Sequence, residues 1–232
     1  MKTIGLIGGM SWESSIEYYR VINEETKKRL GGLHNAVSLM HTVDFAEIEV
    51  MQREGRWAET DNILVDAARK LQAGGADFIV LCTNTMHKSA EKIVAAIDIP
   101  FLHIADATAR KVRDAGITSI ALLGTRYTME EDFYIGRLQR DFGLEVLVPD
   151  KADRDEVHRV IFEELVQGKV LPESRQKYLA IIQKLAGRGA QGVILGCTEI
   201  GLLVKQPDTP LPVFDTTLVH AVAAVEMALE EK

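Results

Sequence analysis

KLQAGGADFIVLCTNT (70–85) and KLAGRGAQGVILGCTE (184–199) align without gaps, with residue 70 on residue 184 and a constant offset of 114. In each, a stretch with helical periodicity ends near glycine and a short apolar run follows. Glycine often ends a helix, and such a run is typical of a strand buried on both faces of a parallel sheet. The two segments therefore predict the same helix–turn–strand unit, present twice.

The repeat extends to both sides of these segments. IGLIGG (4–9) resembles IALLGT (120–125) at an offset of 116, and IPFLHI (99–104) resembles LPVFDT (211–216) at an offset of 112. Apolar runs alternate with helical stretches, which predicts βαβ units. Agreement over three stretches favours two related halves. We expect an α/β fold of two pseudo-symmetric Rossmann-like domains with parallel sheets.

The repeat also sets the expected domain boundaries. An N-terminal α/β domain would comprise residues 1–106 plus 217–232, and a C-terminal α/β domain residues 107–216. The final helix, TLVHAVAAVEMALEE, would then pack back onto the first domain. No Pro/Gly/Ser-rich linker separates the halves, so we expect a compact body with an active-site cleft between the domains.

Composition narrows the class of partner. The chain has 232 residues, a net charge of −7 and no block of basic residues, which argues against nucleic acid or an acidic membrane surface. No apolar run approaches the roughly 18–20 residues that span a bilayer. The start, MKTIGLIGG, predicts a buried strand and not a signal peptide. Two cysteines without a disulfide framework indicate the cytoplasm.

The offset of 114 decides which residues correspond at the two cysteines. Thr83 is the counterpart of Cys197, whereas Cys82 falls on Gly196. Successive strand side chains point to opposite faces, so a shift of one residue turns a side chain away from a cleft. We therefore interpret Cys82 as a small apolar side chain of the strand, not as the partner of Cys197.

Polar residues follow both strand ends. Asn84 and Thr85 come after Thr83, and Thr198 and Glu199 come after Cys197. The carboxyl ends of strands in open α/β sheets form the ligand crevice, and turn amides or helix N-termini there bind anions such as a substrate carboxylate. The same positive end would lower the thiol pKa and make a thiolate available near neutral pH. Local sequence leaves a buried structural cysteine open as the alternative.

The first predicted strand ends in GLIGGMS (5–11). It lacks G-x-G-x-x-G spacing, so a nucleotide phosphate is a poor fit. We expect this turn to bind a substrate carboxylate through Met10 and Ser11, with Thr125 at the matching turn of the second half. The alternative is a turn that only needs glycine.

NTMH (84–87), GCTE (196–199) and GLIGGM (5–10) resemble motifs of the aspartate/glutamate racemase family. The resemblance spans nearly the whole chain and is closest to bacterial aspartate/glutamate and broad-specificity amino-acid racemases. It implies a small-molecule amino-acid substrate, no pyridoxal phosphate, no metal and no other cofactor. It also implies a homodimer. Two cysteines, one from each domain, would face the substrate Cα from opposite sides.

Racemisation needs proton removal from one face of Cα and protonation from the other, which two opposed acid–base groups supply. The family's usual Cys-Asn-Thr-x-His run has threonine in place of its cysteine here, at Thr83. A threonine hydroxyl hardly ionises near neutral pH. The resemblance thus implies that Cys197 deprotonates the L-enantiomer, while Thr83, directly or through water, aids protonation of the opposite face.

Five other residues carry expectations. By the resemblance, Gln52 lies where family members bind the side-chain carboxylate of the substrate. Its neutral amide would admit a broader range of substrate side chains. Arg53 is interpreted as a solvated helix charge, and Lys169 as a further candidate cation. Trp12 and Trp57 are expected in the core or the cleft wall.

Two other classes of function stay open from the sequence. One is a related arylmalonate-type decarboxylase or maleate-type cis–trans isomerase, because the decarboxylases resemble a single-cysteine design. The other is a non-catalytic binder of small molecules made of two α/β lobes. Such a binder has no need of a cysteine at a strand end.

Overall fold

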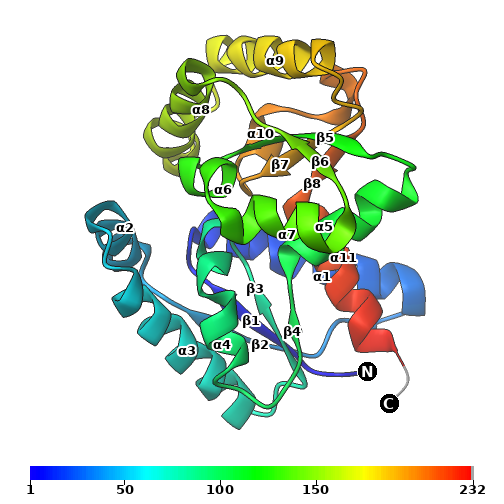
Figure 1. The fold of residues 1–232 in the computed structure, drawn as a ribbon. Helices are drawn as coiled ribbons and strands as arrows, with labels where there is room; N and C mark the ends of the chain where they lie inside the picture. The colour runs from blue at the N-terminus through cyan, green and yellow to red at the C-terminus, as the bar shows by residue number, and fades with distance from the viewer. Residues whose placement is uncertain (231–232) are drawn as a thin grey trace. The chain divides into compact units, whose positions relative to one another are not determined.

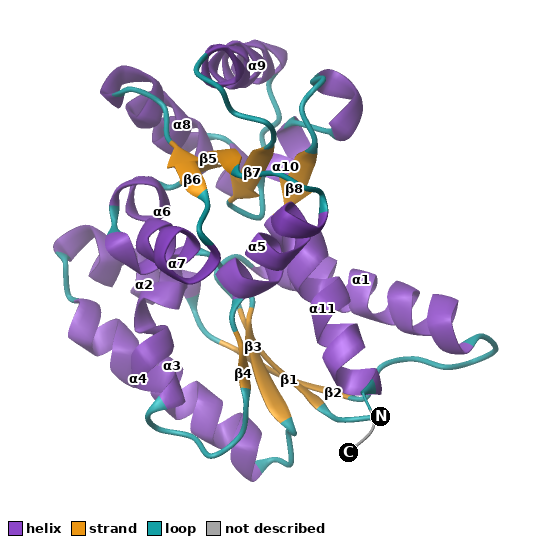
Figure 2. Cartoon of the chain, turned by 45° about the vertical axis from the view of Figure 1, so that its right-hand side comes forward, coloured by secondary structure: helices purple, strands orange, loops and turns teal. Residues whose placement is uncertain are grey.

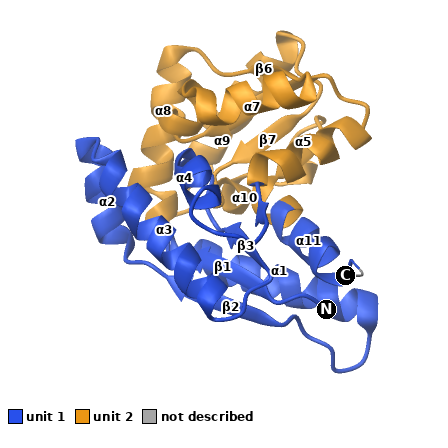
Figure 3. Cartoon of the chain, turned by 60° about the horizontal axis from the view of Figure 1, so that its bottom comes forward, with its two compact units in different colours: residues 1–103, 220–232 blue, residues 104–219 orange. Residues whose placement is uncertain are grey.

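The computed structural model describes residues 1–230, and it divides into two compact units. Unit 1 consists of Met1–His103 and the C-terminal segment from His220, and unit 2 consists of Ile104–Val219 (Figure 3). The chain thus passes between the units twice. The domain boundaries expected at 106/107 and 216/217 stay a prediction.

Each unit is built on one four-stranded parallel sheet (Figure 1). In unit 1 the order is β2-β1-β3-β4, with β1 (Ile4–Gly8), β2 (Ser38–Thr42), β3 (Phe78–Leu81) and β4 (Phe101–Leu102). In unit 2 it is β6-β5-β7-β8, with β5 (Ser119–Gly124), β6 (Glu145–Leu147), β7 (Val193–Gly196) and β8 (Val213–Asp215). The predicted α/β class with parallel sheets is confirmed.

Helices join the strands as crossover connections (Figure 2). Unit 1 contains α1 (Trp12–Leu30), α2 (Phe45–Glu54), α3 (Trp57–Ala73), the 3-10 helix η1 (Thr85–Ser89) and α4 (Ala90–Val94). Unit 2 contains α5 (Ile104–Asp114), α6 (Arg126–Glu130), α7 (Asp132–Phe142), α8 (Lys151–Glu163), η2 (Leu165–Gln167), α9 (Pro172–Gly187), α10 (Ile200–Leu203) and η3 (Gln206–Asp208), and α11 (Thr216–Leu229) returns to unit 1. Within residues 1–230, no helix combines the length and apolar character needed to cross a membrane.

The strand registers reproduce the offsets read from the sequence. Gly5 of β1 pairs with Ile79 of β3, and Ala121 of β5 pairs with Val193 of β7. Residues 5 and 121 differ by 116, and residues 79 and 193 differ by 114, as in the sequence alignment. The pairing of β3 with β4 and of β7 with β8 keeps the offset of 112. The two sheets therefore repeat each other residue by residue.

The unit 1 sheet is covered on both faces because its side chains alternate between them. One face packs against α1 and α11 through Ile4, Leu6, Tyr18, Ile22, Phe78, Val80, Cys82, Ala221, Ala224 and Val225. The other packs against α2 and α3 through Ile7, Ile48, Leu64, Ala68, Leu71, Ile79 and Leu81. Buried His220 joins α11 to this unit, since its two ring nitrogens lie 2.8 Å from Tyr18 Oη and 2.9 Å from Leu102 O.

Unit 2 repeats this arrangement. α8 and α9 cover one face through residues that include Val157, Ile161, Tyr178, Ile182, Val193 and Leu195. α5 and α7 cover the other through residues that include Ile104, Val112, Ile120, Tyr134, Leu138 and Ile194. Buried apolar surface stabilises each layer by roughly 25 cal/mol per Å² removed from water.

The two tryptophans behave differently. Trp57 packs on the α3 face of the unit 1 core, and the Lys88 ammonium lies 3.9 Å from its ring centroid. Trp12 is 61% exposed, so it is not part of the core, and that part of the prediction is wrong. The reason is rotational: Tyr18 and Ile22 of α1 face the sheet, and Trp12 lies on another side of the helix.

Candidate active site

The turn after β1 is built around a glycine. Gly9 has φ +98°, and a Cβ there would collide with Val43 O, so only glycine fits. Its N–H donates to Ser15 Oγ at 2.8 Å. Ser11 caps α1, its Oγ accepting from Ser14 N at 3.3 Å. The shape of the turn itself therefore requires glycine at this position.

Met10 and Ser11 are buried at this turn, 5% and 4% exposed. Thr125 takes the corresponding place after β5 in unit 2, where it caps α6 and its Oγ1 accepts from Thr128 N at 3.4 Å. Both turns lie at the carboxyl end of the first strand of their sheet. Carboxylate binding by these three residues stays a prediction.

Cys82 belongs to the core of unit 1. Its side chain is fully buried in the layer between the sheet and α1, and burial raises the pKa of its thiol far above the usual range. It continues the alternation of Phe78 and Val80, which face the same layer. Its counterpart, Gly196, has no space for a side chain, because a Cβ there would lie 2.9 Å from Leu122 Cδ1. The structural position of Cys82 agrees with its interpretation as a packing residue.

Thr83 lies two residues after the end of β3 and begins a compact polar turn. Its N–H donates to Leu81 O at 2.9 Å, and its carbonyl oxygen lies 2.6 Å from His87 Nδ1. The His87 N–H donates to Asn84 O at 3.1 Å. Thr83, Asn84 and Thr85 are all buried, at 7%, 3% and 7% exposed. The ring of His87 therefore holds the backbone of this segment in place.

Two further contacts gather the predicted residues of unit 1 at one sheet edge. Ser14 Oγ donates to Cys82 O at 3.1 Å, which ties the first turn of α1 to the end of β3. Gln52 of α2 is buried, and its Nε2 lies 2.9 Å from Met86 Sδ. The turn after β1, the end of β3 and the end of α2 thus meet at the carboxyl edge of the unit 1 sheet.

The two candidate cations make local contacts. Arg53 is exposed, and its Nε lies 3.4 Å from Glu49 Oε1 one turn earlier on α2, so its interpretation as a solvated helix charge is confirmed. Lys169 donates from Nζ to Gln167 Oε1 at 2.8 Å. A role for Lys169 toward a substrate stays a prediction.

Cys197 directly follows β7 and lies beside a carboxylate. Its half-buried Sγ lies 2.9 Å from Glu199 Oε2, which also accepts from Thr198 Oγ1 at 2.7 Å. Glu199 is 5% exposed. Cys197 continues the alternation of Val193 and Leu195 on the α9 face of the sheet. Sulfur, hydroxyl and carboxylate therefore form one hydrogen-bonded group.

The environment of Cys197 raises the pKa of its thiol well above the usual range. Burial is the largest cause, and the Glu199 carboxylate is the next. Backbone N–H groups of Thr198 and Glu199 act in the opposite direction and are outweighed. The expectation of a lowered pKa is therefore wrong. The following helix, Ile200–Leu203, has four residues, so few peptide dipoles add up, and the carboxylate lies closer.

Serine hydroxyls in α1 were missing from the predicted site. Ser14 and Ser15 are buried and bind the end of β3 and the turn after β1. Two adjacent small polar residues just after a helix cap are a signal in the sequence, since they can accept from turn amides. Their partner in β3 lies 68 residues away, at Cys82 O, and only the fold shows that contact.

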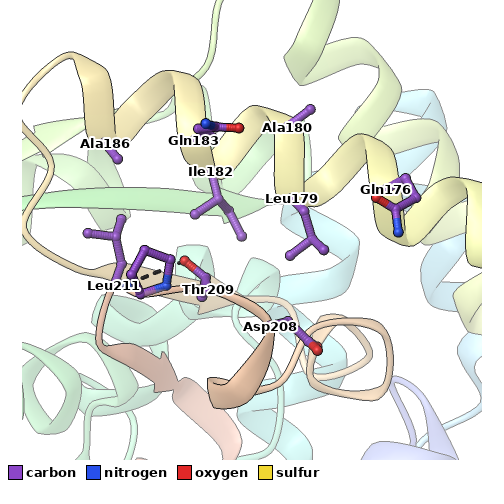
Figure 4. A pocket seen from close by; sticks show the side chains of 10 residues that line it. Gln176, Leu179, Ala180, Ile182, Gln183, Ala186, Asp208, Thr209 and Leu211 are labelled. Atoms are coloured by element: carbon purple, nitrogen blue, oxygen red, sulfur yellow. Dashed lines mark hydrogen bonds between the residues drawn. The ribbon is translucent and has the colours of Figure 1, made fainter.

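Unit 2 has a separate hollow between α9 and the loop before β8, with a volume of about 400 Å³ (Figure 4). It is lined by Gln176, Leu179, Ala180, Ile182, Gln183, Ala186, Asp208, Thr209, Pro210 and Leu211. In unit 1, Gln72 of α3 bridges to Asp98, accepting from its N–H at 2.7 Å. By the offsets of 114 and 112, their counterparts are Ala186 and Pro210, which cannot make this bridge. The hollow does not include Cys197.

Fold and strand ends together define a class: duplicated α/β proteins of two parallel sheets, with a polar side chain, Thr83 or Cys197, at the equivalent position after a strand of each sheet. The sequence profile of the Asp/Glu/Hydantoin racemase family matches residues 7–224. The chain belongs to that family. Within residues 1–230, no group of three or more His, Cys, Asp or Glu side chains is placed to hold a metal ion.

Individual relatives agree with the family. The broad specificity amino-acid racemase RacX of Bacillus subtilis (strain 168) is 24% identical over 231 residues, covering 97% of this chain and 98% of that protein. A crystal structure from Yersinia pestis, assigned as an Asp/Glu racemase, is 54% identical with a TM-score of 0.93 and covers 99% of this chain and 100% of that one. An aspartate racemase homologue from Pyrococcus horikoshii OT3 is 34% identical with a TM-score of 0.86, at 99% and 100% coverage.

Proposed function

We propose that this protein is an amino-acid racemase of the aspartate/glutamate type that works without a cofactor, with Cys197 as the base and Thr83 on the opposite face of Cα. The family and its named relatives support racemase chemistry. The observation that carries the assignment of residues is the shared register: Thr83 and Cys197 follow Leu81 and Leu195, which are themselves equivalent in the two sheets.

The two groups differ in acidity, and this makes the enzyme asymmetric. A thiol ionises near pH 8.5 in water, whereas a threonine hydroxyl hardly ionises in the physiological range. Cys197 can therefore remove a proton from Cα, and Thr83 can only donate one or hold a water that does so. By the resemblance to the family, Cys197 faces the Cα hydrogen of the L-enantiomer, so the L-enantiomer is the substrate that loses its proton quickly.

Glu199 completes the acid–base group. Because the Cys197 thiol is protonated at rest, its proton must leave before sulfur can act as a base, and Glu199 Oε2 at 2.9 Å is the acceptor. The thiolate then takes the Cα proton. Thr83 Oγ1–H, or a water that it holds, returns a proton to the opposite face. The hydroxyl regains its proton from solvent, and Glu199 returns to the carboxylate form.

Substrate binding follows from the remaining residues. Met10, Ser11 and Thr125 supply turns for the α-carboxylate, and Asn84, Thr85 and Thr198 supply amide, hydroxyl and backbone N–H groups around it. Gln52 faces the substrate side chain. Its amide is neutral, so it binds a carboxylate less strongly than a cation would and admits other side chains.

Exchange of the Cα hydrogen in heavy water tests this function. The protein is incubated with L- or D-aspartate, L- or D-glutamate and a panel of neutral amino acids, and deuterium at Cα is followed by NMR. We expect rapid exchange from at least one L-substrate, slow exchange from its D-enantiomer, and racemisation without added pyridoxal phosphate or metal. Rapid exchange of the D-enantiomer would contradict the assignment of Thr83.

A single-cysteine decarboxylase is the second candidate, because this chain has one thiol at the paired strand ends. It would form the same kind of carbanion by losing carbon dioxide and would protonate it from Cys197. Release of carbon dioxide from a substituted malonate, with no exchange of any amino acid, would favour this candidate.

We also expect a homodimer in the cytoplasm that binds neither nucleic acid nor membranes. The relatives' family and the acidic chain support this expectation. Sedimentation of the purified protein gives the oligomeric state directly.

A further inference from the structure

We propose that His87 is a positioning residue for Thr83. Its imidazole binds the carbonyl oxygen of Thr83 and thereby sets the direction of the residue that returns the proton to Cα. The inference rests on the proposed function, in which Thr83 serves the face of Cα opposite Cys197. It adds that the hydroxyl side of the reaction depends on a supporting side chain, whereas the backbone on the thiol side is held by the main chain.

Thr83 lies beyond the hydrogen-bond ladder of the unit 1 sheet. Pairing of β1 with β3 ends at Ile7 and Leu81, and the N–H of Cys82 still donates to Ile7 O at 2.9 Å. The N–H of Thr83 instead turns back to Leu81 O at 2.9 Å, which closes a three-residue turn. The ladder therefore fixes the direction of Cys82 but not that of Thr83.

The carbonyl of Thr83 is bound by a buried imidazole. It lies 2.6 Å from His87 Nδ1, and because a carbonyl oxygen can only accept, Nδ1 must carry the proton that it receives. His87 and Thr83 are 2% and 7% exposed, so water competes little for this carbonyl. The N–H of His87 also donates to Asn84 O at 3.1 Å. One residue thus fixes the two peptide groups on either side of Asn84.

Other rings of unit 1 hold this imidazole in place. The ring of His103 is nearest, with its centroid 4.5 Å from that of His87. The centroids of Phe101 and His220 follow at 5.5 and 5.9 Å. All three rings meet His87 in the edge-on arrangement that aromatic rings prefer. His220 is itself tied to Tyr18, whose Oη lies 2.8 Å from its Nδ1. A ring packed in this way has little freedom to turn, so it can hold a backbone group in a fixed position.

The duplicated half has no room for such a ring. Continued by two residues past the aligned segment, the offset of 114 makes Gly201 the counterpart of His87. The offset of 112 makes Asp215 the counterpart of His103. A Cβ at Gly201 would collide with Asp215 Oδ2, so a side chain cannot enter at this position of unit 2.

The main chain performs the same task in unit 2. Pairing of β5 with β7 continues to Gly124 and Gly196, one position further than in unit 1, so the ladder reaches the residue next to Cys197. The carbonyl oxygen of Cys197 accepts from Ile200 N–H at 3.1 Å. Replacing His87 should therefore disturb the hydroxyl side of the reaction and spare the thiol side.

Two rates in heavy water report on the two sides separately. Cys197 exchanges its thiol proton with solvent through Glu199, so it can remove the Cα hydrogen of the L-enantiomer and return deuterium to the same face. This cycle labels the L-enantiomer without inversion. Formation of the D-enantiomer also needs a proton from Thr83. A displaced Thr83 lowers only the rate of inversion, and a displacement of about 1 Å can cost roughly 10²-fold.

The experiment compares the wild type with three variants of His87. His87→Asn keeps an amide N–H donor near the position of Nδ1, His87→Gln moves that donor out to the position of Nε2, and His87→Ala has no donor. Each protein is incubated in heavy water with L-aspartate and with L-glutamate. Labelling of the L-enantiomer is followed by NMR, and formation of the D-enantiomer by chiral chromatography.

The ratio of inversion to labelling is the decisive quantity. We expect His87→Gln and His87→Ala to lower it by roughly 10-fold or more, and His87→Asn to restore most of it. A merely structural role of His87 would lower both rates together and leave the ratio unchanged.

The outcomes distinguish this inference from the proposed function. A wild type that neither labels nor inverts either substrate would contradict the proposed function, and this inference with it. If the wild type does both, an unchanged ratio in His87→Gln and His87→Ala, or an equal fall in His87→Asn, would overturn the role of His87 alone.

The tautomer of His87 gives a readout that needs no variant. NMR of the ¹⁵N-labelled wild-type protein should show a proton on Nδ1 of His87. A proton on Nε2 alone would overturn the proposal, because Nδ1 could not then donate to Thr83 O.

Discussion

The two sheets of this protein superimpose in register but end in different chemistry. The third strand of unit 1 is followed by a hydroxyl at Thr83, and that of unit 2 is followed by a thiol at Cys197. The preceding positions differ in the opposite sense, with Cys82 buried in a core and Gly196 packed too closely for any side chain. The two halves thus share a backbone register and differ in the side chains at these equivalent positions.

Removing the thiol tests this contrast with the largest expected effect. Cys197→Ala should lower the rate of Cα exchange from the L-substrate by roughly 10²–10⁴, the usual contribution of a positioned base. Cys82→Ala should leave the rate per folded molecule near wild type and should lower stability, because it empties space in the core. The rates come from NMR exchange, and stability comes from urea unfolding. A large loss of exchange in folded Cys82→Ala would reverse the assignment of the two cysteines.

Placing a thiol after both equivalent strands should raise the rate of Cα exchange from the D-enantiomer. Thr83→Cys places a thiol at both equivalent positions and should raise Cα exchange from the D-enantiomer by roughly 10²-fold, within the range for general-base catalysis. Exchange from the L-enantiomer should change little. Thr83→Ser is the control, since it keeps a hydroxyl of similar acidity and should give no gain. An unchanged D-rate in folded Thr83→Cys would count against Thr83 as the missing base.

Replacing Glu199 should have a smaller effect, and it should change two measured rates in opposite directions: alkylation of Cys197 and Cα exchange. Glu199→Gln removes the negative charge that raises the pKa of Cys197, so that pKa should fall, although burial should keep it above the usual range. At fixed pH, alkylation of Cys197 by iodoacetamide should therefore become faster. Exchange from the L-substrate should fall by roughly 10-fold or more, because the proton acceptor is gone.

The pH dependence of alkylation separates these two effects. In wild type the alkylation rate should still rise with pH above pH 8.5, and in Glu199→Gln the rise should begin at lower pH. Identical profiles for the two proteins would show that the carboxylate does not influence the thiol.

The smallest expected effect is on stability, and it comes from adding a side chain at the closely packed end of β7. Gly196→Ala would bring a Cβ to 2.9 Å from Leu122 Cδ1 and 3.0 Å from Leu123 O, so we expect a loss of about 1–3 kcal/mol of unfolding free energy. Gly187→Ala, at the end of α9 with open space around it, should be neutral or stabilising. Urea unfolding of both variants measures the difference. Equal stabilities would mean that the strand end tolerates a side chain.

The features that repeat between the two halves could be predicted from the sequence, whereas those that depend on local side-chain contacts could not. Offsets of 116, 114 and 112 predicted the correspondence between sheets, and the strand registers reproduce all three. The equivalence of Thr83 with Cys197 follows from the same pattern. Backbone pairing has a period of two residues and a fixed spacing, so its consequences can be read along the chain.

Two predictions were wrong, both because they depended on side-chain direction. Cys197 was expected to have a lowered pKa, but the Glu199 carboxylate turns toward its sulfur. Trp12 was assigned to the core or the cleft wall, and the core assignment fails because the face of α1 that contains Tyr18 packs on the sheet instead. Neither direction is encoded in spacing alone, since a side chain has several rotamers and a helix can present either of two apolar faces.

The amino-acid sequence by itself determined the duplicated α/β fold, the matched strand ends and the presence of one thiol, Cys197, at the two matched positions. These features depend on the order of apolar and polar residues, which local backbone geometry converts directly into strands and helices. Only the tertiary structure decided the raised pKa of the Cys197 thiol, the contacts of Ser14 and Ser15, and the exposure of Trp12. Each of these depends on which atoms lie within a few ångströms, and packing brings those atoms together from distant parts of the chain or selects among their rotamers.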